Sequence, residues 1–217
     1  MDDDAQLKVI EYSVRKANSM EEKLGVLEQC FSSTLTSPLL SIGWHHKRYL
    51  GFSIPSQLTH TILKEYIDHD TEILEIGAGL GLYASVMGTP RFCKRWIATD
   101  HPQTYQEWIP EGNQHPFTPI YLTTNPLETF SPHTPPEKRV LLTIWPEPNS
   151  TYFWDDYIQK FNGNTVIIIG TPGVTGDDSM WDLLTEAYPC KHTSTTVCKI
   201  NLGAFFDFES IYIWTKN

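Results

Sequence analysis

Basic residues are scarce in this sequence. Its 217 residues include 16 Lys and Arg against 26 Asp and Glu, which gives a formal net charge of −10 at pH 7. Enzymes that act on large nucleic acids usually carry a basic face that neutralises phosphates. Here the one compact basic cluster is the His-His-Lys-Arg stretch at 45–48. The composition therefore argues against a nucleic-acid partner, although it does not exclude one.

Cysteines and long apolar runs are also few. The four cysteines have no C-x-x-C spacing, and the acidic start Met1-Asp-Asp-Asp4 does not resemble a signal peptide. We therefore expect a reducing, cytoplasmic environment. No apolar run approaches the ~20 residues of a membrane span, so no membrane partner is expected. The histidines show no H-E-x-x-H spacing, and the group Cys190, His192 and Cys198 lacks a fourth ligand, so we expect no metal site.

Alternating strand and helix patterns fill most of the chain. Short apolar runs at 72–76, 95–99, 119–123, 140–144 and 165–169 are separated by helical segments, and two extended segments follow at 190–200 and 210–215. This alternation predicts an α/β fold, a mostly parallel seven-stranded sheet with helices on both faces and an antiparallel pair at the carboxyl end. We expect residues 51–217 to form this domain and residues 1–50 to form a helical extension packed on it.

A glycine-rich turn follows the first predicted strand. Glu75 lies near the end of that strand, and Gly77, Gly79 and Gly81 follow on alternate positions. Without a Cβ, such glycines let the backbone approach a flat ligand closely. Asp100 ends the next apolar run, where a carboxylate can accept hydrogen bonds from both hydroxyls of a ribose. The segment therefore predicts a nucleoside-binding crevice.

Two protein families use such a turn. The dinucleotide pattern G-x-G-x-x-G/A formally fits Gly79 to Ala84, but the strand ends at Ile76, so the turn begins at Gly77. Counted from there, the segment reads E-x-G-x-G-x-G and resembles the first motif of class I S-adenosylmethionine-dependent methyltransferases. The resemblance implies S-adenosylmethionine as cofactor, with the loop around Ala78 against its methionine part and Asp100 on its ribose. We favour this interpretation over the dinucleotide site.

Further motifs between residues 50 and 190 look like a poorly characterised set of class I methyltransferase-like proteins. They include an Ile-Pro before the glycine turn, a Trp-Pro after the fourth strand and a Thr-Gly-Asp loop at 175–177. The likeness places Pro55 at the edge of the cofactor and Asn125 beside its adenine. The chain departs from the pattern at Thr171, where the set has Glu, and at Glu147, where it has Pro.

The end of the fourth predicted strand is where we expect the methyl acceptor. Methyl transfer is an in-line displacement that depends mainly on holding the donor and the acceptor in line. Trp145 can stack on a planar acceptor, and Glu147 is the best candidate for a general base. We therefore expect a methyltransferase acting on a small-molecule or protein acceptor. The alternatives are an inactive cofactor-binding module that works through a protein partner and a nucleic-acid methyltransferase.

Overall fold

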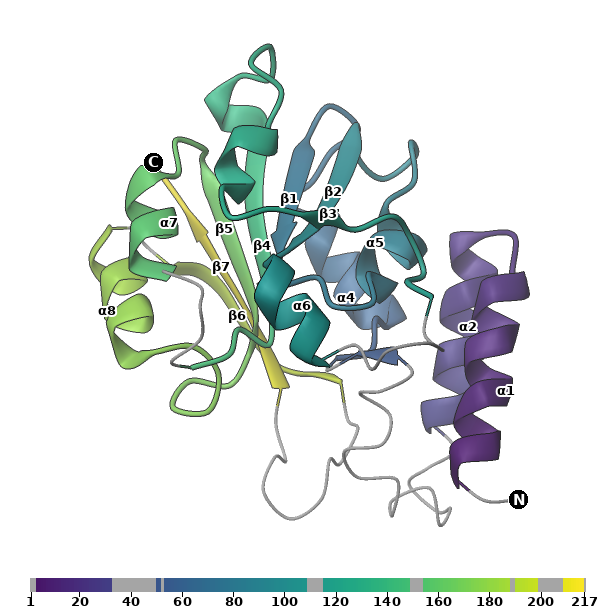
Figure 1. The fold of residues 1–217 in the computed structure, drawn as a ribbon. Coiled ribbons are helices and arrows are strands. Elements are labelled where there is room, and N and C mark those ends of the chain that lie inside the picture. Colours follow the sequence, from purple (N-terminus) through teal and green to yellow (C-terminus); the bar gives the residue numbers. More distant parts are fainter. Residues whose placement is uncertain are drawn as a thin grey trace.

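The computed structural model describes residues 3–32, 50–51, 53–108, 115–148, 154–187, 190–198 and 209–216. One seven-stranded sheet forms its centre (Figure 1). In chain order the strands are β1 (Glu72–Ile76), β2 (Arg95–Asp100), β3 (Tyr121–Leu122), β4 (Arg139–Ile144), β5 (Thr165–Gly170), β6 (Cys190–Cys198) and β7 (Glu209–Thr215).

The strand order in the sheet is β3-β2-β1-β4-β5-β7-β6. The first five strands pair in parallel, whereas β7 is antiparallel to both β5 and β6. The expected α/β fold with a terminal antiparallel pair is thereby confirmed. The third strand is shorter than predicted, because only Tyr121 and Leu122 pair, with the last two residues of β2 at the edge of the sheet.

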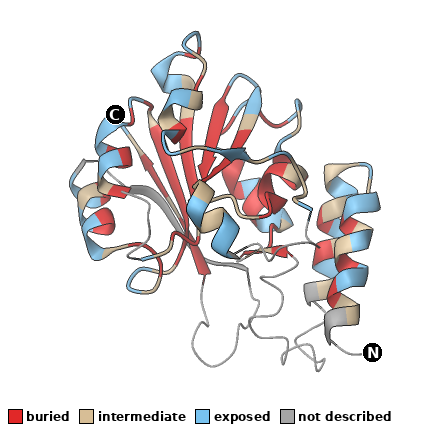
Figure 2. Cartoon of the chain, in the orientation of Figure 1, coloured by how far each residue is buried: buried red, intermediate tan, exposed pale blue. Residues whose placement is uncertain are grey.

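The central strands are buried on both faces. Every residue of β1 and β5 is buried, as expected for parallel strands that have helices on both sides. Alternate side chains of β1 point to opposite faces, so Ile73 joins one apolar core while Leu74 and Ile76 join another. Figure 2 shows the buried residues along the sheet and on the helices that cover it. The continuous apolar runs in the sequence follow from this double burial.

Helices cover both faces of the sheet. One core includes residues of α1 (Asp3–Lys16), α2 (Met20–Ser32), α4 (Gln57–Leu63) and α5 (Leu82–Met87). The other includes residues of α7 (Trp154–Lys160) and α8 (Asp178–Ala187). The short α6 (Pro102–Trp108) follows β2, and two 3-10 helices, η3 (Pro126–Thr129) and η4 (Pro136–Lys138), precede β4. The molecule therefore has three layers (Figure 1).

The amino-terminal helices share a core with the sheet. Leu7, Ile10 and Val14 form the buried face of α1, and Leu24 and Leu27 that of α2. This periodic burial is the one that the spacing of the apolar residues predicts. The two helices lie beside α4 and α5 at one side of the molecule (Figure 1).

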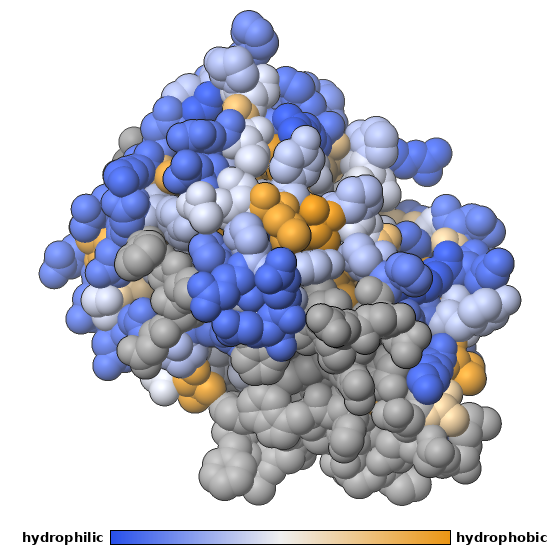
Figure 3. All heavy atoms as spheres, in the orientation of Figure 1, coloured by the Kyte–Doolittle hydropathy of each residue, from blue (hydrophilic) through white to orange (hydrophobic). Residues whose placement is uncertain are grey.

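Polar residues dominate the face of the molecule seen in Figure 3, where a small apolar patch interrupts them. Tyr121 and Leu122 of the edge strand β3 are among the exposed large hydrophobic residues. Within the described ranges, no helix combines the length and the apolar character needed to cross a bilayer.

Candidate functional site

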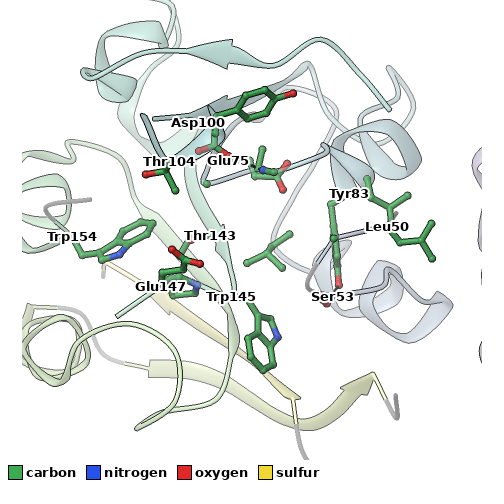
Figure 4. Close-up of a pocket in the computed structure, with 18 residues that line it drawn as sticks. Leu50, Ser53, Glu75, Tyr83, Asp100, Thr104, Thr143, Trp145, Glu147 and Trp154 are labelled. Atoms are coloured by element: carbon green, nitrogen blue, oxygen red, sulfur yellow. Dashed lines mark hydrogen bonds between the residues drawn. The ribbon is translucent and has the colours of Figure 1, made fainter. Parts of the chain in front are cut away.

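A cavity opens at the carboxyl ends of β1, β2 and β4. Because β1 lies between β2 and β4, the strand order reverses direction at this point, where sheets of this kind bind ligands. Four segments supply most of its walls: the glycine loop after β1, the end of β2, the end of β4 and the stretch before α4 (Figure 4). Seven of the predicted site residues line it: Glu75, Gly77, Ala78, Gly79, Asp100, Trp145 and Glu147.

The glycine loop combines an open position with a packed one. Its three glycines all have positive φ angles. A Cβ added to Gly79 would meet no atom within 4 Å, whereas one added to Gly81 would lie 2.7 Å from the side chains of Thr118 and Ile120. Gly79 therefore leaves space for a ligand, while Gly81 allows the close approach of the segment before β3.

Asp100 connects the glycine loop to the end of β2 through hydrogen bonds. Its Oδ2 accepts a 2.8 Å hydrogen bond from the backbone N–H of Gly79, and its Oδ1 accepts one of 2.8 Å from the N–H of His101. The loop is further anchored by the N–H of Ala78, which donates to the carbonyl of Thr99 at 2.9 Å. Since a carboxylate has about four lone-pair sites, Asp100 can still accept hydrogen bonds from ligand hydroxyls.

Glu75 has a buried carboxyl group and lies near the carboxyl end of the central strand β1, beside Asp100 at the end of β2. It is 2% exposed, and its Oε2 accepts a 2.7 Å hydrogen bond from the indole N–H of Trp96. Burial raises the pKa of Glu75 to about 8, the bond from Trp96 opposes that rise, and the nearby charge of Asp100 adds to it. Burial therefore favours the neutral form of Glu75.

Trp145 and Glu147 follow the end of β4. Trp145 has a φ of 53°, the one positive value for a non-glycine residue in the described part of the chain. Its indole points away from Glu75 and Asp100 (Figure 4). The indole N–H donates a hydrogen bond to the carboxylate of Glu209. Glu147, which is partly exposed, lines the cavity beside Thr143 (Figure 4).

Three predicted cofactor residues lie outside the cavity lining: Pro55, Gly81 and Asn125. Pro55 is buried and precedes α4, whose N-cap is Ser56. Asn125 is exposed and is the N-cap residue of η3, where its N–H donates to Thr123 Oγ1 at 3.0 Å. The Asn125 side chain makes no cap hydrogen bond to η3.

Several lining residues were not anticipated from the sequence: Ser53, Tyr83, Thr104, Tyr105 and Trp154. Ser53 Oγ lies 2.8 Å from the hydroxyl of Tyr83 and donates to Glu209 at 2.8 Å. Tyr83 could have been predicted as a lining residue, because it lies two residues after the last glycine of the loop. No local pattern marked Glu209.

Within the described ranges, no group of three or more His, Cys, Asp or Glu side chains is arranged to hold a metal ion. The side chains of Cys190, His192 and Cys198, which the sequence places on one face of β6, lie outside the described side chains.

No protein-family model matches the sequence, and no curated protein matches it. Solved structures resemble the fold at low identity. A protein of the NADB-Rossmann superfamily from Streptococcus agalactiae is 10% identical, with a TM-score of 0.48 over 76% of this chain and 70% of that one. M. capricolum TrmK in complex with S-adenosyl-homocysteine is 12% identical, with a TM-score of 0.44 over 73% and 67%. Precorrin-6y C5,15-methyltransferase from Geobacter metallireducens GS-15 is also 12% identical, with a TM-score of 0.46 over 76% and 90%.

Proposed function

We propose that this protein binds S-adenosylmethionine in the cavity and transfers its methyl group to a small-molecule or protein acceptor. The observation that carries the proposal is Gly79. It leaves open space in a loop that lies between two acidic residues, Glu75 near the end of β1 and Asp100 at the end of β2. This is the arrangement that the E-x-G-x-G-x-G resemblance implies.

The residues present suit this cofactor. The loop from Gly77 to Gly79 would lie against its amino-acid part, and Asp100 would accept hydrogen bonds from its ribose hydroxyls. Glu75 is a buried carboxyl that can ionise when a positive charge is placed near it. When bound, S-adenosylmethionine supplies a methyl group activated by a positively charged sulfur.

The walls of the cavity would hold the acceptor in line with that methyl group. Apolar side chains such as Leu50, Leu82 and Trp154 line it and would exclude water. Orientation of this kind can contribute about 7–11 kcal/mol to lowering a barrier. Glu147 is the residue we assign to take up a proton from an acceptor N–H or O–H group. A nucleic-acid acceptor stays an alternative, because the net charge alone does not exclude one.

A second candidate function is a cofactor-binding module that acts through a protein partner without catalysis. The contact between the Trp145 indole and Glu209 favours it, because that indole is already used inside the protein. Glu147 also occupies a position where the methyltransferase-like proteins that the sequence resembles have Pro, so the part of the cavity proposed to hold the acceptor differs from theirs. Both functions require the same cofactor site and differ only in turnover.

We further propose that residues 51–217 form the cofactor-binding unit, with residues 1–50 packed on it as an extension. The burial of Leu7, Leu24 and Leu27 in the same core as Ile73 supports the packing of this extension on the cofactor-binding unit. A cytoplasmic location is proposed as well. The thiol of Cys93, which forms no disulfide, is consistent with a reducing compartment.

Calorimetry with S-adenosylhomocysteine tests the site, and transfer of a radiolabelled methyl group into a cell lysate tests turnover. We expect micromolar binding together with a labelled product. Binding without any labelled product would support the module instead of the enzyme. Absence of binding to the wild-type protein would refute both candidate functions.

A further inference from the structure

The direction of β7 brings a distant carboxylate to the cavity. Because β7 is antiparallel to β5, its first residues lie at the carboxyl end of β5, which is the ligand side of the sheet. Gly170, the last residue of β5, pairs with Ser210, and Glu209 precedes Ser210. Glu209 therefore lies beside the cavity although it is far from the glycine loop in the sequence.

Glu209 joins three residues that line the cavity. One carboxylate oxygen accepts a hydrogen bond from the indole N–H of Trp145, and the other accepts a 2.8 Å bond from Ser53 Oγ. Ser53 Oγ also lies 2.8 Å from the hydroxyl of Tyr83. Since Ser53 gives its single proton to Glu209, Tyr83 donates to Ser53. One buried carboxylate thus connects the segment before α4, the first turn of α5 and the end of β4.

The end of β4 depends on contacts of this kind. A positive φ is unfavourable for a bulky residue such as Trp145, and it persists only where the surrounding structure holds it. The Trp145 N–H donates to the carbonyl of Ile169 at 2.7 Å, which fixes the backbone. Its indole is fixed by Glu209. The turn at Trp145 leads directly to Pro146 and Glu147, which line the cavity.

We infer that Glu209 is a positioning residue of this site, whose carboxylate holds Trp145 and the Ser53–Tyr83 pair and thereby fixes the wall that carries Glu147. This inference rests on the proposed function of the cavity. It does not require Glu209 to touch a ligand, because its three partners line the cavity. A carboxylate suits the role since it offers an acceptor to each of two donors, whereas Gln offers one oxygen and adds two donors.

The first test follows the indole N–H resonance of Trp145 in the full-length protein without ligand. Trp145→Phe assigns the signal. We expect Glu209→Ala to shift it and to accelerate its exchange with water at least about tenfold, since a buried hydrogen bond is lost. The control is Ile213→Val, which changes a fully buried residue of the same strand outside this network and should leave the signal in place. An unchanged signal in Glu209→Ala would overturn the inference.

A pH series tests whether the carboxylate of Glu209, and not only the packing of its side chain, positions the indole of Trp145. Burial raises the pKa of Glu209 to about 7, and the hydrogen bonds from Ser53 and Trp145 oppose that rise. Both side chains that donate to this carboxyl are uncharged. We expect the Trp145 resonance to titrate near pH 7 in the wild type and to be flat in Glu209→Gln. A titration that persists in Glu209→Gln would assign it to another group and contradict the inference.

S-adenosylhomocysteine binding gives the functional measurement. We expect the dissociation constant to rise about tenfold in Glu209→Ala and about threefold in Glu209→Gln, with less than a twofold change in Ile213→Val. Unchanged affinity in Glu209→Ala, with a wild type that binds, would overturn the inference. A wild type that does not bind would refute the proposed function, while the resonance measurement would still decide the role of Glu209.

Discussion

The two sides of the cavity are built in different ways. One side comes from a single continuous segment, residues 75–105, which contains the glycine loop, Asp100 and the start of α6. The other side combines Leu50, Gly51, Ser53, the end of β4 and Trp154. Glu209 at the start of β7 connects two of these parts, because it accepts hydrogen bonds from Ser53 and Trp145. The first side is encoded by a short motif, whereas the second exists only after the whole sheet has formed.

A buried glutamate belongs to each side, and each accepts a hydrogen bond from a Trp indole. Glu75 receives its bond from Trp96, and burial raises its pKa to about 8. Glu209 receives bonds from both Trp145 and Ser53, and its pKa reaches about 7. Hydrogen bonds to the ionised form oppose the effect of burial. In both residues burial is the largest effect on the pKa, and Glu75 alone has a further contribution from the charge of Asp100.

The largest effect is expected at the motif-encoded side, from Gly79→Val. The new side chain would occupy the space that we assign to the cofactor, and we expect S-adenosylhomocysteine affinity to fall by more than about 100-fold. Gly173→Val is the matched control. Gly173 also has a positive φ and open space around it, but it does not line the cavity. Calorimetry should therefore show wild-type affinity for the control, and equal losses in both variants would point to backbone strain alone.

Asp100→Asn should give the next largest effect. The amide cannot accept as many hydrogen bonds from the Gly79 and His101 N–H groups and from a ribose as the carboxylate can. We expect affinity for S-adenosylhomocysteine to fall by about 10- to 100-fold, the equivalent of roughly 1.4–2.7 kcal/mol. Asp156→Asn, which alters an exposed carboxylate on α7, serves as control. A fall of less than twofold in Asp100→Asn would remove Asp100 from the proposed site.

The two buried glutamates should differ in how they affect stability against pH. A raised folded-state pKa means that the folded protein binds more protons than the unfolded chain, so stability falls as pH rises from about 4.5 to the folded value. Glu75→Gln removes this loss and should raise the free energy of unfolding by about 1–3 kcal/mol at pH 8.5, with no gain near pH 4. For Glu209→Gln the gain should level off near pH 7. Urea unfolding at several pH values measures both, and a gain at pH 4 as large as that at pH 8.5 would contradict the assignment.

The sheet was predictable because its main signals are local. Parallel strands buried on both faces leave continuous apolar runs, and β5 reads as such a run from Thr165 to Ile169. The edge strand β3 was predicted too long, since Tyr121 and Leu122 have exposed side chains and only the end of β2 is available for pairing. Propensity marks a segment as extended but does not limit how many of its residues find a partner strand.

The site was predictable mainly on the side built from residues 75–105, and on the other side only Trp145 and Glu147 at the end of β4 were predicted. The spacing of Glu75, Gly79 and Asp100 is short enough to be read along the sequence, and all three line the cavity. The bond between Ser53 and Glu209 joins residues 156 positions apart, and it depends on β7 being inserted between β5 and β6. No periodicity or spacing reports such a contact, so the carboxylate at the start of β7 became visible only in the structure.

The smallest effect is expected from Asn125→Ala, which tests how far the motif-encoded side extends toward η3. Sequence position and the family resemblance suggested that Asn125 borders the adenine, yet its side chain is exposed and the residue does not line the cavity. We therefore expect S-adenosylhomocysteine affinity to change by less than about twofold, under 0.5 kcal/mol. Stability should change little as well, because the Asn125 side chain makes no cap hydrogen bond to η3 and the bond to Thr123 comes from the backbone N–H. A tenfold loss of affinity in calorimetry would mean that the bound protein brings η3 to the ligand, and the continuous segment that forms this side of the site would then extend beyond α6.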